Sequence, residues 1–371
     1  MKYYIIAGEA SGDVHAANLI RSIKEKDNQA VFRAWGGDRM EVQGAEIVKH
    51  YRDLAFMGFI EVLFNIRTIA RNISYCKKDI LSFKPDVLIL VDYPGFNLRI
   101  AEFAHKQGIK VVYYISPQVW AWKKSRVYKI KKVVDKMLVI LPFEEAFYAK
   151  YGVQVEFVGH PLLDEIKNQK KISREEFLNK NGLKDQPIIA LLPGSRKQEI
   201  GKMLKIMLKV TSDYPDYQFI IGGLPSISPD YYDKIVKDSN ATVLFDQTSG
   251  LLQHAEAALV TSGTATLETA LMDVPEVVCY KANLISVAIA KRIIDVKFIS
   301  LVNLIMDREI VKELIQNNLT PENLSSEFGL LLNDKEKIQL LKEDYKQLKE
   351  KLGKEGASER AADIILNILK E

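Results

Sequence analysis

Short apolar runs that alternate with helical patterns limit the fold of this chain more than any other feature. The runs predict strands at residues 3–7, 30–35, 86–91, 110–115, 136–141, 155–158, 188–192, 218–222, 242–245, 257–260 and 276–280. Strands that alternate with helices are typical of parallel, doubly wound sheets. We therefore predict an α/β protein with one such sheet in each half. Two such domains facing each other leave a cleft, the usual place for a small-molecule site.

The 371 residues are enough for two domains, each with its own core. A polar linker-like stretch at 168–171 places the N-terminal domain at 1–167 and the C-terminal domain at 168–340. Residues 300–304 are predicted to be a short extended piece, followed by a helix over 308–316. The charged helical residues 341–371 are predicted to pack back on the first domain.

Composition narrows the class of protein. A net charge of +4 does not favour a bulk nucleic-acid binder. Cys76 and Cys279 are far apart and lack metal-ligand spacing, so we expect a reduced cytoplasmic setting without a zinc site or disulfide framework. The chain opens on a strand without a signal-peptide pattern, and its apolar runs fall short of the ~20 residues of a membrane span. Any membrane contact is expected from outside the bilayer.

The turn Pro193-Gly194-Ser195-Arg196 joins a predicted strand to a helical pattern. A helix N-terminus offers unpaired N–H groups and a positive dipole end, which suit a phosphate. Arg196 adds a planar fork that matches phosphate oxygens. The alternative is that this turn is only a connection.

A second turn of this kind, Thr261-Ser262-Gly263-Thr264, also opens a helical pattern. Its hydroxyl and N–H groups can hold phosphate oxygens, and Glu268 can accept both hydroxyls of a ribose. The alternative is a capping box. Together with the Arg196 turn, the pattern favours a nucleotide-diphosphate site. Asn303 could contact the ligand or only cap the chain locally.

Polar residues also follow the strands of the first half, among them Glu9, Asp92, Ser116 and His160. Asp92 follows the apolar run Val87–Val91, and a partly buried carboxylate there is a candidate general base because burial raises its pKa. The alternative is an Asp that caps the next helix. The turn Gly8–Asp13 departs from the dinucleotide pattern G-x-G-x-x-G, which disfavours a dehydrogenase. Its alternative is a helix start capped by Ser11 or Asp13.

Two further segments suggest contact with lipid. Residues 54–66 are unusually apolar, which indicates either a buried core helix or a surface that meets an acyl chain. Residues 120–136 hold seven basic residues between Lys123 and Lys136, beside two tryptophans and a tyrosine. This second pattern fits a solvated helix face, an anionic membrane surface or single-stranded nucleic acid. The modest net charge favours the membrane or a phosphorylated substrate.

These motifs, in this order, resemble the lipid A disaccharide synthases, a bacterial family of inverting glycosyltransferases. The resemblance covers roughly residues 5–320 and rests on Gly8–Asp13, Met57–Val62, Ser116–Trp122, Leu141–Glu144, Leu192–Arg196, Ser262–Glu268 and Ser300–Leu304. The Trp-Ala-Trp element at 120–122 is especially specific. Two residues depart from the family pattern: Gln118 stands where Ser is usual, and Glu276 where Met is usual.

The resemblance implies a GT-B architecture of two Rossmann-like domains, with C-terminal helices that cross back to the first. It implies transfer of 2,3-diacylglucosamine from UDP-2,3-diacylglucosamine to the 6-hydroxyl of 2,3-diacylglucosamine 1-phosphate, giving a β-1,6 disaccharide and UDP. Neither a metal nor another cofactor is expected. The enzyme would be cytoplasmic and peripherally bound to the anionic inner-membrane surface, without a nucleic-acid partner; an oligomer is left open.

Carried onto this sequence, the resemblance assigns residue roles. Asp92 would be the base. The acceptor side would be lined by Glu9, Ser11, Asp13, Met57 and Trp120. UDP would be held by Arg196, Ser262, Gly263, Thr264, Glu268 and Asn303. The membrane would be met by Phe56, Phe59, Trp122, Lys123, Lys124 and Arg126. The alternatives are a UDP-N-acetylglucosamine 2-epimerase and a non-catalytic nucleotide-sugar or RNA-binding protein.

Overall fold

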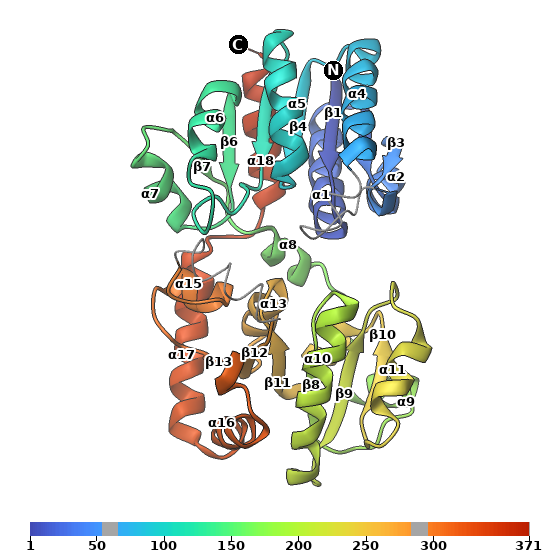
Figure 1. The fold of residues 1–371 in the computed structure, drawn as a ribbon, viewed down its shortest axis with the longest axis vertical. Helices are drawn as coiled ribbons and strands as arrows, with labels where there is room; N and C mark the ends of the chain where they lie inside the picture. The colour runs from blue at the N-terminus through green and yellow to red at the C-terminus, as the bar shows by residue number, and fades with distance from the viewer. Residues whose placement is uncertain (54–65, 283–295, 371) are drawn as a thin grey trace. The chain divides into compact units, whose positions relative to one another are not determined.

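The computed structural model describes residues 1–53, 66–282 and 296–370. They form two units, one of residues 1–164 with 352–371 and one of residues 165–351. Each unit is a parallel sheet with helices on both faces (Figure 1). The predicted α/β class with two doubly wound parallel sheets is therefore confirmed.

The first unit has a seven-stranded sheet in the order β3-β2-β1-β4-β5-β6-β7. Its elements are β1 (Lys2–Ala7), α1 (Ala10–Lys26), β2 (Val31–Gly36), α2 (Asp38–Val42), β3 (Glu46–His50), α4 (Ile66–Phe83), β4 (Val87–Val91), α5 (Pro94–Lys106), β5 (Lys110–Tyr114), α6 (Arg126–Val133), β6 (Lys136–Val139), α7 (Phe143–Ala149), β7 (Glu156–Phe157) and α18 (Ala357–Ile368). All five residues of β4 are buried, as their unbroken apolar run requires in a sheet covered on both faces.

The second unit has a six-stranded sheet in the order β10-β9-β8-β11-β12-β13. Its elements are α9 (Arg174–Asn181), β8 (Ile188–Leu192), α10 (Lys197–Met207), β9 (Gln218–Gly223), α11 (Pro229–Val236), β10 (Thr242–Phe245), α12 (Thr248–His254), β11 (Ala255–Thr261), α13 (Thr264–Leu271), β12 (Glu276–Tyr280), α15 (Leu301–Met306), β13 (Lys312–Ile315), α16 (Pro321–Asn333) and α17 (Lys335–Lys351). The helix α8 (Pro161–Lys167) carries the chain from one unit to the next.

The end of the chain returns to the first unit through α18, which packs on α1 (Figure 1). Small and branched apolar residues of α18, such as Ala361 and Ile365, are fully buried. Lys26 of α1 binds Asp363 of α18 at 2.6 Å. Residues 352–371, which contain α18, therefore belong to the first unit, whereas α17 belongs to the second.

Two local predictions in the second unit are wrong. Residues 300–304 are not extended, because Leu301–Met306 form α15, with Ser300 as its N-cap accepting a hydrogen bond from the Asn303 N–H. Residues 308–316 are not a helix, because Lys312–Ile315 form β13 and pair in parallel with β12. Asp307, in the left-handed conformation, ends α15 and redirects the chain.

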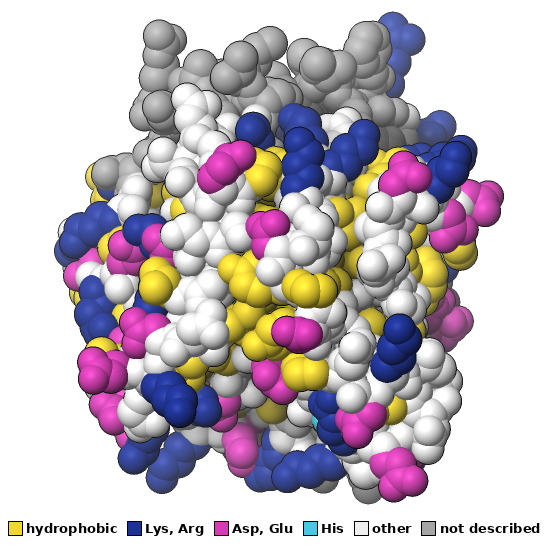
Figure 2. Space-filling model, turned by 90° about the horizontal axis from the view of Figure 1, so that it is seen from below, with side chains coloured by type: hydrophobic (Ala, Val, Ile, Leu, Met, Phe, Trp, Pro, Cys, Tyr) yellow, Lys and Arg dark blue, Asp and Glu magenta, His cyan; other side chains and the backbone are white. Residues whose placement is uncertain are grey.

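Figure 2 shows one face of the molecule, on which acidic and basic side chains are interspersed around hydrophobic ones. In the part of the chain that the structure describes, each helix is too short or too polar to cross a membrane.

Candidate functional site

The candidate base lies at the switch point of the first sheet. Strand order reverses between β1 and β4, which pair side by side as far as Ala7 and Val91. Ligands of doubly wound sheets bind beyond the carboxyl ends of the strands at this point. Glu9 follows β1 and Asp92 follows β4, so the fold brings these two predicted site residues to one place.

Asp92 is held by an unusual backbone. Asp92 and Tyr93 both have left-handed conformations, with φ of 43° and 48°. Such residues cost about 1–3 kcal/mol each and persist where their surroundings fix them. The Asp92 carbonyl accepts hydrogen bonds from the Asn97 amide at 2.8 Å and from the Tyr113 hydroxyl, and its N–H donates to Ile115 at 3.2 Å. The carboxylate is therefore anchored from the main chain.

Burial, the largest cause, and the nearby Glu9 carboxylate together raise the pKa of Asp92 to about 7, against smaller opposing effects of the Tyr93 N–H and His15. A carboxyl group with this pKa can both accept and release a proton near neutral pH. The alternative sequence reading, an Asp that caps the following helix, is wrong: α5 has Tyr93 as its N-cap and no side-chain capping bond.

The first turn and the Asp92 loop fit closely together. A Cβ added at Gly8 would lie 2.3 Å from the Tyr93 ring, so only glycine leaves room for that ring. The N-cap of α1 is Glu9, without a side-chain capping bond. The expectation that Ser11 or Asp13 caps this helix is therefore wrong, since both lie within its first turn. Ser11 is exposed there.

The Asp13 carboxylate is buried and hydrogen-bonded to the backbone of the protein. Its carboxylate accepts hydrogen bonds from the N–H groups of Gly37 at 2.7 Å, Arg39 at 3.0 Å and Met40 at 3.3 Å, and only 2% of its surface is exposed. This carboxylate caps α2 across the sheet edge. The geometry thus favours a role in positioning the turn after β2 over direct contact with an acceptor.

The basic, tryptophan-containing segment of residues 120–136 lies partly in the core and partly at the surface. Trp120 is buried and packs edge-on against Phe143, with ring centroids 5.0 Å apart. Trp122 is exposed, and its ring lies 5.0 Å from the Lys123 ammonium and 4.8 Å from the Arg126 guanidinium carbon. Lys124 is exposed beside them. Phe56, Met57 and Phe59 lie outside the described residues.

The switch point of the second sheet lies between β8 and β11. The Arg196 turn follows β8 and the Ser262 turn follows β11. A Cβ added at Gly194 would be 3.4 Å from the Thr261 methyl, so the two turns adjoin. Arg196 is the N-cap of α10, is 61% exposed and lies 3.4 Å from a Glu199 oxygen. Two helix N-termini and a guanidinium thus gather at one sheet edge.

The residues of the Ser262 turn and of the helix after it differ in exposure and in the hydrogen bonds that they already make. Gly263 and Thr264 are exposed at the start of α13. The Ser262 hydroxyl donates to the Ile299 carbonyl at 2.7 Å, so it also fixes the chain that leads into α15. Burial, the larger cause, and the Glu165 carboxylate together raise the pKa of Glu268 to about 7.

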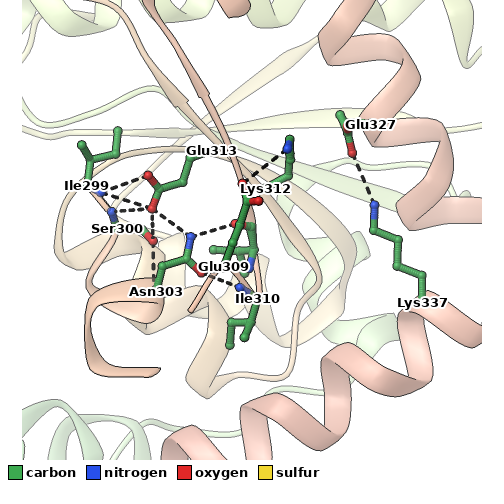
Figure 3. A network of polar contacts seen from close by, with 10 residues as sticks. Ile299, Ser300, Asn303, Glu309, Ile310, Lys312, Glu313, Glu327 and Lys337 are labelled. Carbon is green, nitrogen blue, oxygen red and sulfur yellow. Dashed lines mark hydrogen bonds and ion pairs between the residues drawn. The ribbon is translucent and has the colours of Figure 1, made fainter. Parts of the chain in front are cut away.

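Asn303 is fully buried in a network of hydrogen bonds (Figure 3). Its carbonyl oxygen accepts from the Ile310 and Val311 N–H groups, and its amide donates to the Val311 carbonyl and to Glu313 at 2.9 Å. Glu313 also accepts from Ser300. These bonds use the capacity of the amide, so Asn303 supports α15 and β13 instead of offering a free contact to a ligand.

Glu144 is a further buried polar residue of the first unit, and the sequence did not mark it as a site candidate. Glu144 follows β6 and is fully buried, and it accepts a hydrogen bond from the Leu141 N–H at 3.0 Å. Burial raises its pKa to about 7. The Ser116 hydroxyl lies 2.8 Å from the Tyr148 hydroxyl nearby. The signal was present in sequence, since Ser116 and Glu144 both follow strands, but nothing there showed that the two ends adjoin.

His160 is another buried group at this edge. Burial, the larger cause, and the nearby His15 together lower its pKa to about 3. It is therefore neutral at physiological pH, and its Nδ1 accepts a hydrogen bond from the Leu162 N–H. Among the described residues, His, Cys, Asp and Glu do not gather in threes close enough to hold a metal ion.

The profile of the lipid-A-disaccharide synthetase family matches residues 3–368. The chain belongs to this family.

Relatives named lipid-A-disaccharide synthase match along nearly the whole length. The one from Trichlorobacter lovleyi is 38% identical, with 99% of this chain and 97% of the relative covered. The one from Syntrophus aciditrophicus is 40% identical with the same coverage. A solved UDP-GlcNAc 2-epimerase from Neisseria meningitidis, bound to UDP-GlcNAc, has a TM-score of 0.67 over 99% of this chain and all of the other, at 14% identity. That likeness shows a shared fold, whereas the sequence places this chain among the disaccharide synthases.

Proposed function

We propose that this member of the lipid-A-disaccharide synthetase family is a glycosyltransferase that joins two acylated glucosamines. The donor is UDP-2,3-diacylglucosamine and the acceptor is 2,3-diacylglucosamine 1-phosphate. The acceptor 6-hydroxyl attacks the anomeric carbon of the donor, a C–O bond forms, and the bond to the diphosphate breaks. The products are the β-1,6 disaccharide 1-phosphate and UDP.

The observation that carries this proposal, beyond family membership, is Asp92 at the switch point of the first sheet with a pKa raised to about 7. Inversion in one displacement needs a base for the proton of the attacking hydroxyl. Asp92 has the right chemistry because it is ionised in a useful fraction at neutral pH. Glu9, which acts on the pKa of Asp92, and the exposed Ser11 in the first turn of α1 suit hydroxyl groups of a sugar.

The leaving diphosphate needs charge stabilisation. The N-termini of α10 and α13 and the Arg196 guanidinium gather at the switch point of the second sheet. Preorganised donors of this kind lower the energy of a developing phosphate anion. We assign Arg196, Gly263 and Thr264 to the diphosphate and Glu268 to the ribose, with Ser262 and Asn303 as residues that position them.

We further propose that the enzyme works at the surface of the anionic inner membrane, on its cytoplasmic side. Trp122, Lys123 and Lys124 are exposed, and Arg126 is partly buried beside them; the Trp122 ring lies close to the cations of Lys123 and Arg126. Such a group suits the headgroup level of an anionic bilayer. This proposal brings the protein to the place where acylated substrates reside.

The deciding experiment is a product assay with the purified protein, UDP-2,3-diacylglucosamine and 2,3-diacylglucosamine 1-phosphate. Mass spectrometry should detect the disaccharide 1-phosphate and UDP in equal amounts, and the new linkage should be β. Incubation with UDP-N-acetylglucosamine alone is the matched control. A C2 epimer formed there, with no disaccharide in the first assay, would refute the proposal.

A further inference from the structure

A small cavity lies in the second unit beside β12, β13, α16 and α17. Its volume is about 110 Å³, several times the ~30 Å³ that a water molecule occupies in the liquid. Its walls include Glu276, Val277, Val311, Leu331 and Leu341. Glu276 is the first residue of β12 and Val277 pairs with Lys312, so the cavity lies toward the amino ends of these strands.

The cavity is separate from the nucleotide turns. Thr261, which precedes the Ser262 turn, pairs with Cys279, whereas Glu276 lies three residues earlier on the same strand. At ~3.3 Å per residue this is about 10 Å along β12. A ligand in the cavity would therefore occupy a second site.

Glu276 is the unusual member of this cavity. None of its surface is exposed, and neither carboxylate oxygen has a hydrogen-bond partner among the residues that the structure describes. Two polar groups that interact electrostatically with Glu276 are already engaged: the Tyr345 hydroxyl donates to the Val274 carbonyl at 3.3 Å, and Glu313 accepts from Ser300 and Asn303. A buried carboxyl group without a partner is costly in either protonation state.

The other charges around the cavity occur in pairs (Figure 3). Lys312 lies 3.4 Å from Glu309, and Lys337 lies 3.3 Å from Glu327. Asp344, a further lining residue, pairs with Arg308. Neither lysine is paired with Glu276, so its oxygens remain the unmatched acceptors of this pocket.

We propose that the cavity binds an aliphatic primary amine, whose ammonium group donates hydrogen bonds to Glu276. An ammonium group supplies three donors and one positive charge, which is what an unpartnered carboxylate lacks. The leucine and valine side chains of the wall suit methylene groups. The acids of the outer pairs, Glu309 and Glu327, offer acceptors for a second ammonium at the far end of a diamine.

An amine fits better than a metal ion. Divalent cations require several oxygen ligands at short distance. The described residues contain no cluster of that kind, and the other acids of the lining, Glu309, Glu327 and Asp344, are each paired with a basic residue. One unpartnered buried carboxyl group beside leucine and valine side chains is instead suited to a single charged head on a methylene stem.

Titration calorimetry with 1,4-diaminobutane tests the proposal on the full-length protein, and 1,4-butanediol serves as the uncharged probe of similar length. The diamine should bind and the diol should not. In Glu276→Gln the affinity should fall about 10–100-fold, because a charge-assisted hydrogen bond is lost. The control Glu175→Gln makes the same chemical change at an exposed residue of α9 in the same unit, outside the cavity, and should leave the affinity unchanged.

A second variant, Glu276→Met, replaces the carboxylate by an unbranched apolar side chain of similar length. It should fold with a melting temperature at least as high as that of the native protein, because an unpaired buried polar group is gone. It should not bind the diamine. Equal binding of the diamine to the native protein and to either Glu276 variant would overturn the proposal, as would the absence of binding at millimolar concentration.

Discussion

The carboxylates of Glu9 and Asp92 follow neighbouring parallel strands, and the charge of the first raises the pKa of the second. Burial is the larger cause of this shift. The pairing resembles the arrangement by which one fold keeps a carboxyl group half protonated near neutral pH. The arrangement sets the pKa of the proposed base near neutral pH. Because part of the shift comes from the Glu9 charge, a change at Glu9 should change the pKa of Asp92.

Replacing Asp92 by Asn removes the proposed base and nearly preserves its shape. Turnover should fall about 10²–10⁴-fold, the usual range for a lost general base. The measurement is kcat with saturating donor and acceptor. Glu102→Gln is the matched control, since it makes the same chemical change in an exposed ion pair of α5 with Lys106 and Lys129. Near-native turnover of Asp92→Asn would reject the assignment.

Replacing Glu9 by Gln should move the pH profile. The Glu9 charge disfavours ionised Asp92, so its removal lowers the pKa of Asp92 from about 7. Because the base works in its ionised form, the acid limb of kcat/KM should shift to lower pH. His15 and the Tyr93 N–H, which act in the opposite direction, are unchanged in this variant. The position of the limb is the readout; a limb that stays in place or moves to higher pH would contradict the coupling.

Arg196→Ala should weaken binding of the UDP-sugar. Loss of a hydrogen bond to a charged oxygen costs about 1.5–3 kcal/mol, or about 10–100-fold in affinity. Calorimetry with UDP measures this directly. Arg174→Ala, which removes an exposed pair with Asp185 in the same unit, should leave UDP affinity unchanged. Unaltered affinity in Arg196→Ala would remove the diphosphate role from this turn.

Neutralising Lys123, Lys124 and Arg126 together with Gln should weaken binding to vesicles that contain anionic lipid. Each basic residue near such a surface contributes about 1 kcal/mol, so the loss should approach 100-fold at low salt. Sedimentation with vesicles at 0.05 and 0.5 M salt measures it. A control variant with Gln at Lys106, Lys110 and Lys150, all exposed in the same unit, should bind like the native protein. Salt-independent binding of the native protein would argue for apolar insertion alone.

The sequence predicted the strands whose residues are buried on both faces. Val87–Val91 could be recognised because every position is apolar. It did not predict β3 or β13, which contain charged residues beside apolar ones and lie at the edges of the sheets. Their strand form depends on pairing with β2 and β12, so tertiary contact decides it. Pairing with β12 also explains why part of the predicted helix at 308–316 is a strand.

The residues of the candidate site also fall into two groups, those that could be placed from the sequence and those that could not. Asp92 and Arg196 could be placed from sequence, because each follows a strand and the carboxyl ends of parallel strands share an edge. Asn303 and Asp13 could not be sorted, since their roles depend on partners that are distant along the chain, such as Glu313 and the Gly37 N–H. The Glu9 effect on Asp92 was likewise invisible before the order of the sheet was known.

The return of α18 to α1 has a consequence for how the protein is made. The first unit needs residues 352–371, which leave the ribosome only after the 187 residues from 165 to 351. At a synthesis rate of about 5–20 residues per second, the apolar side of α1 stays without its packing partner α18 for about 10–40 s. The second unit, which is continuous in the chain, can complete its fold first. A nascent chain stopped before residue 352 should therefore hold a finished second unit and an exposed, chaperone-binding first one.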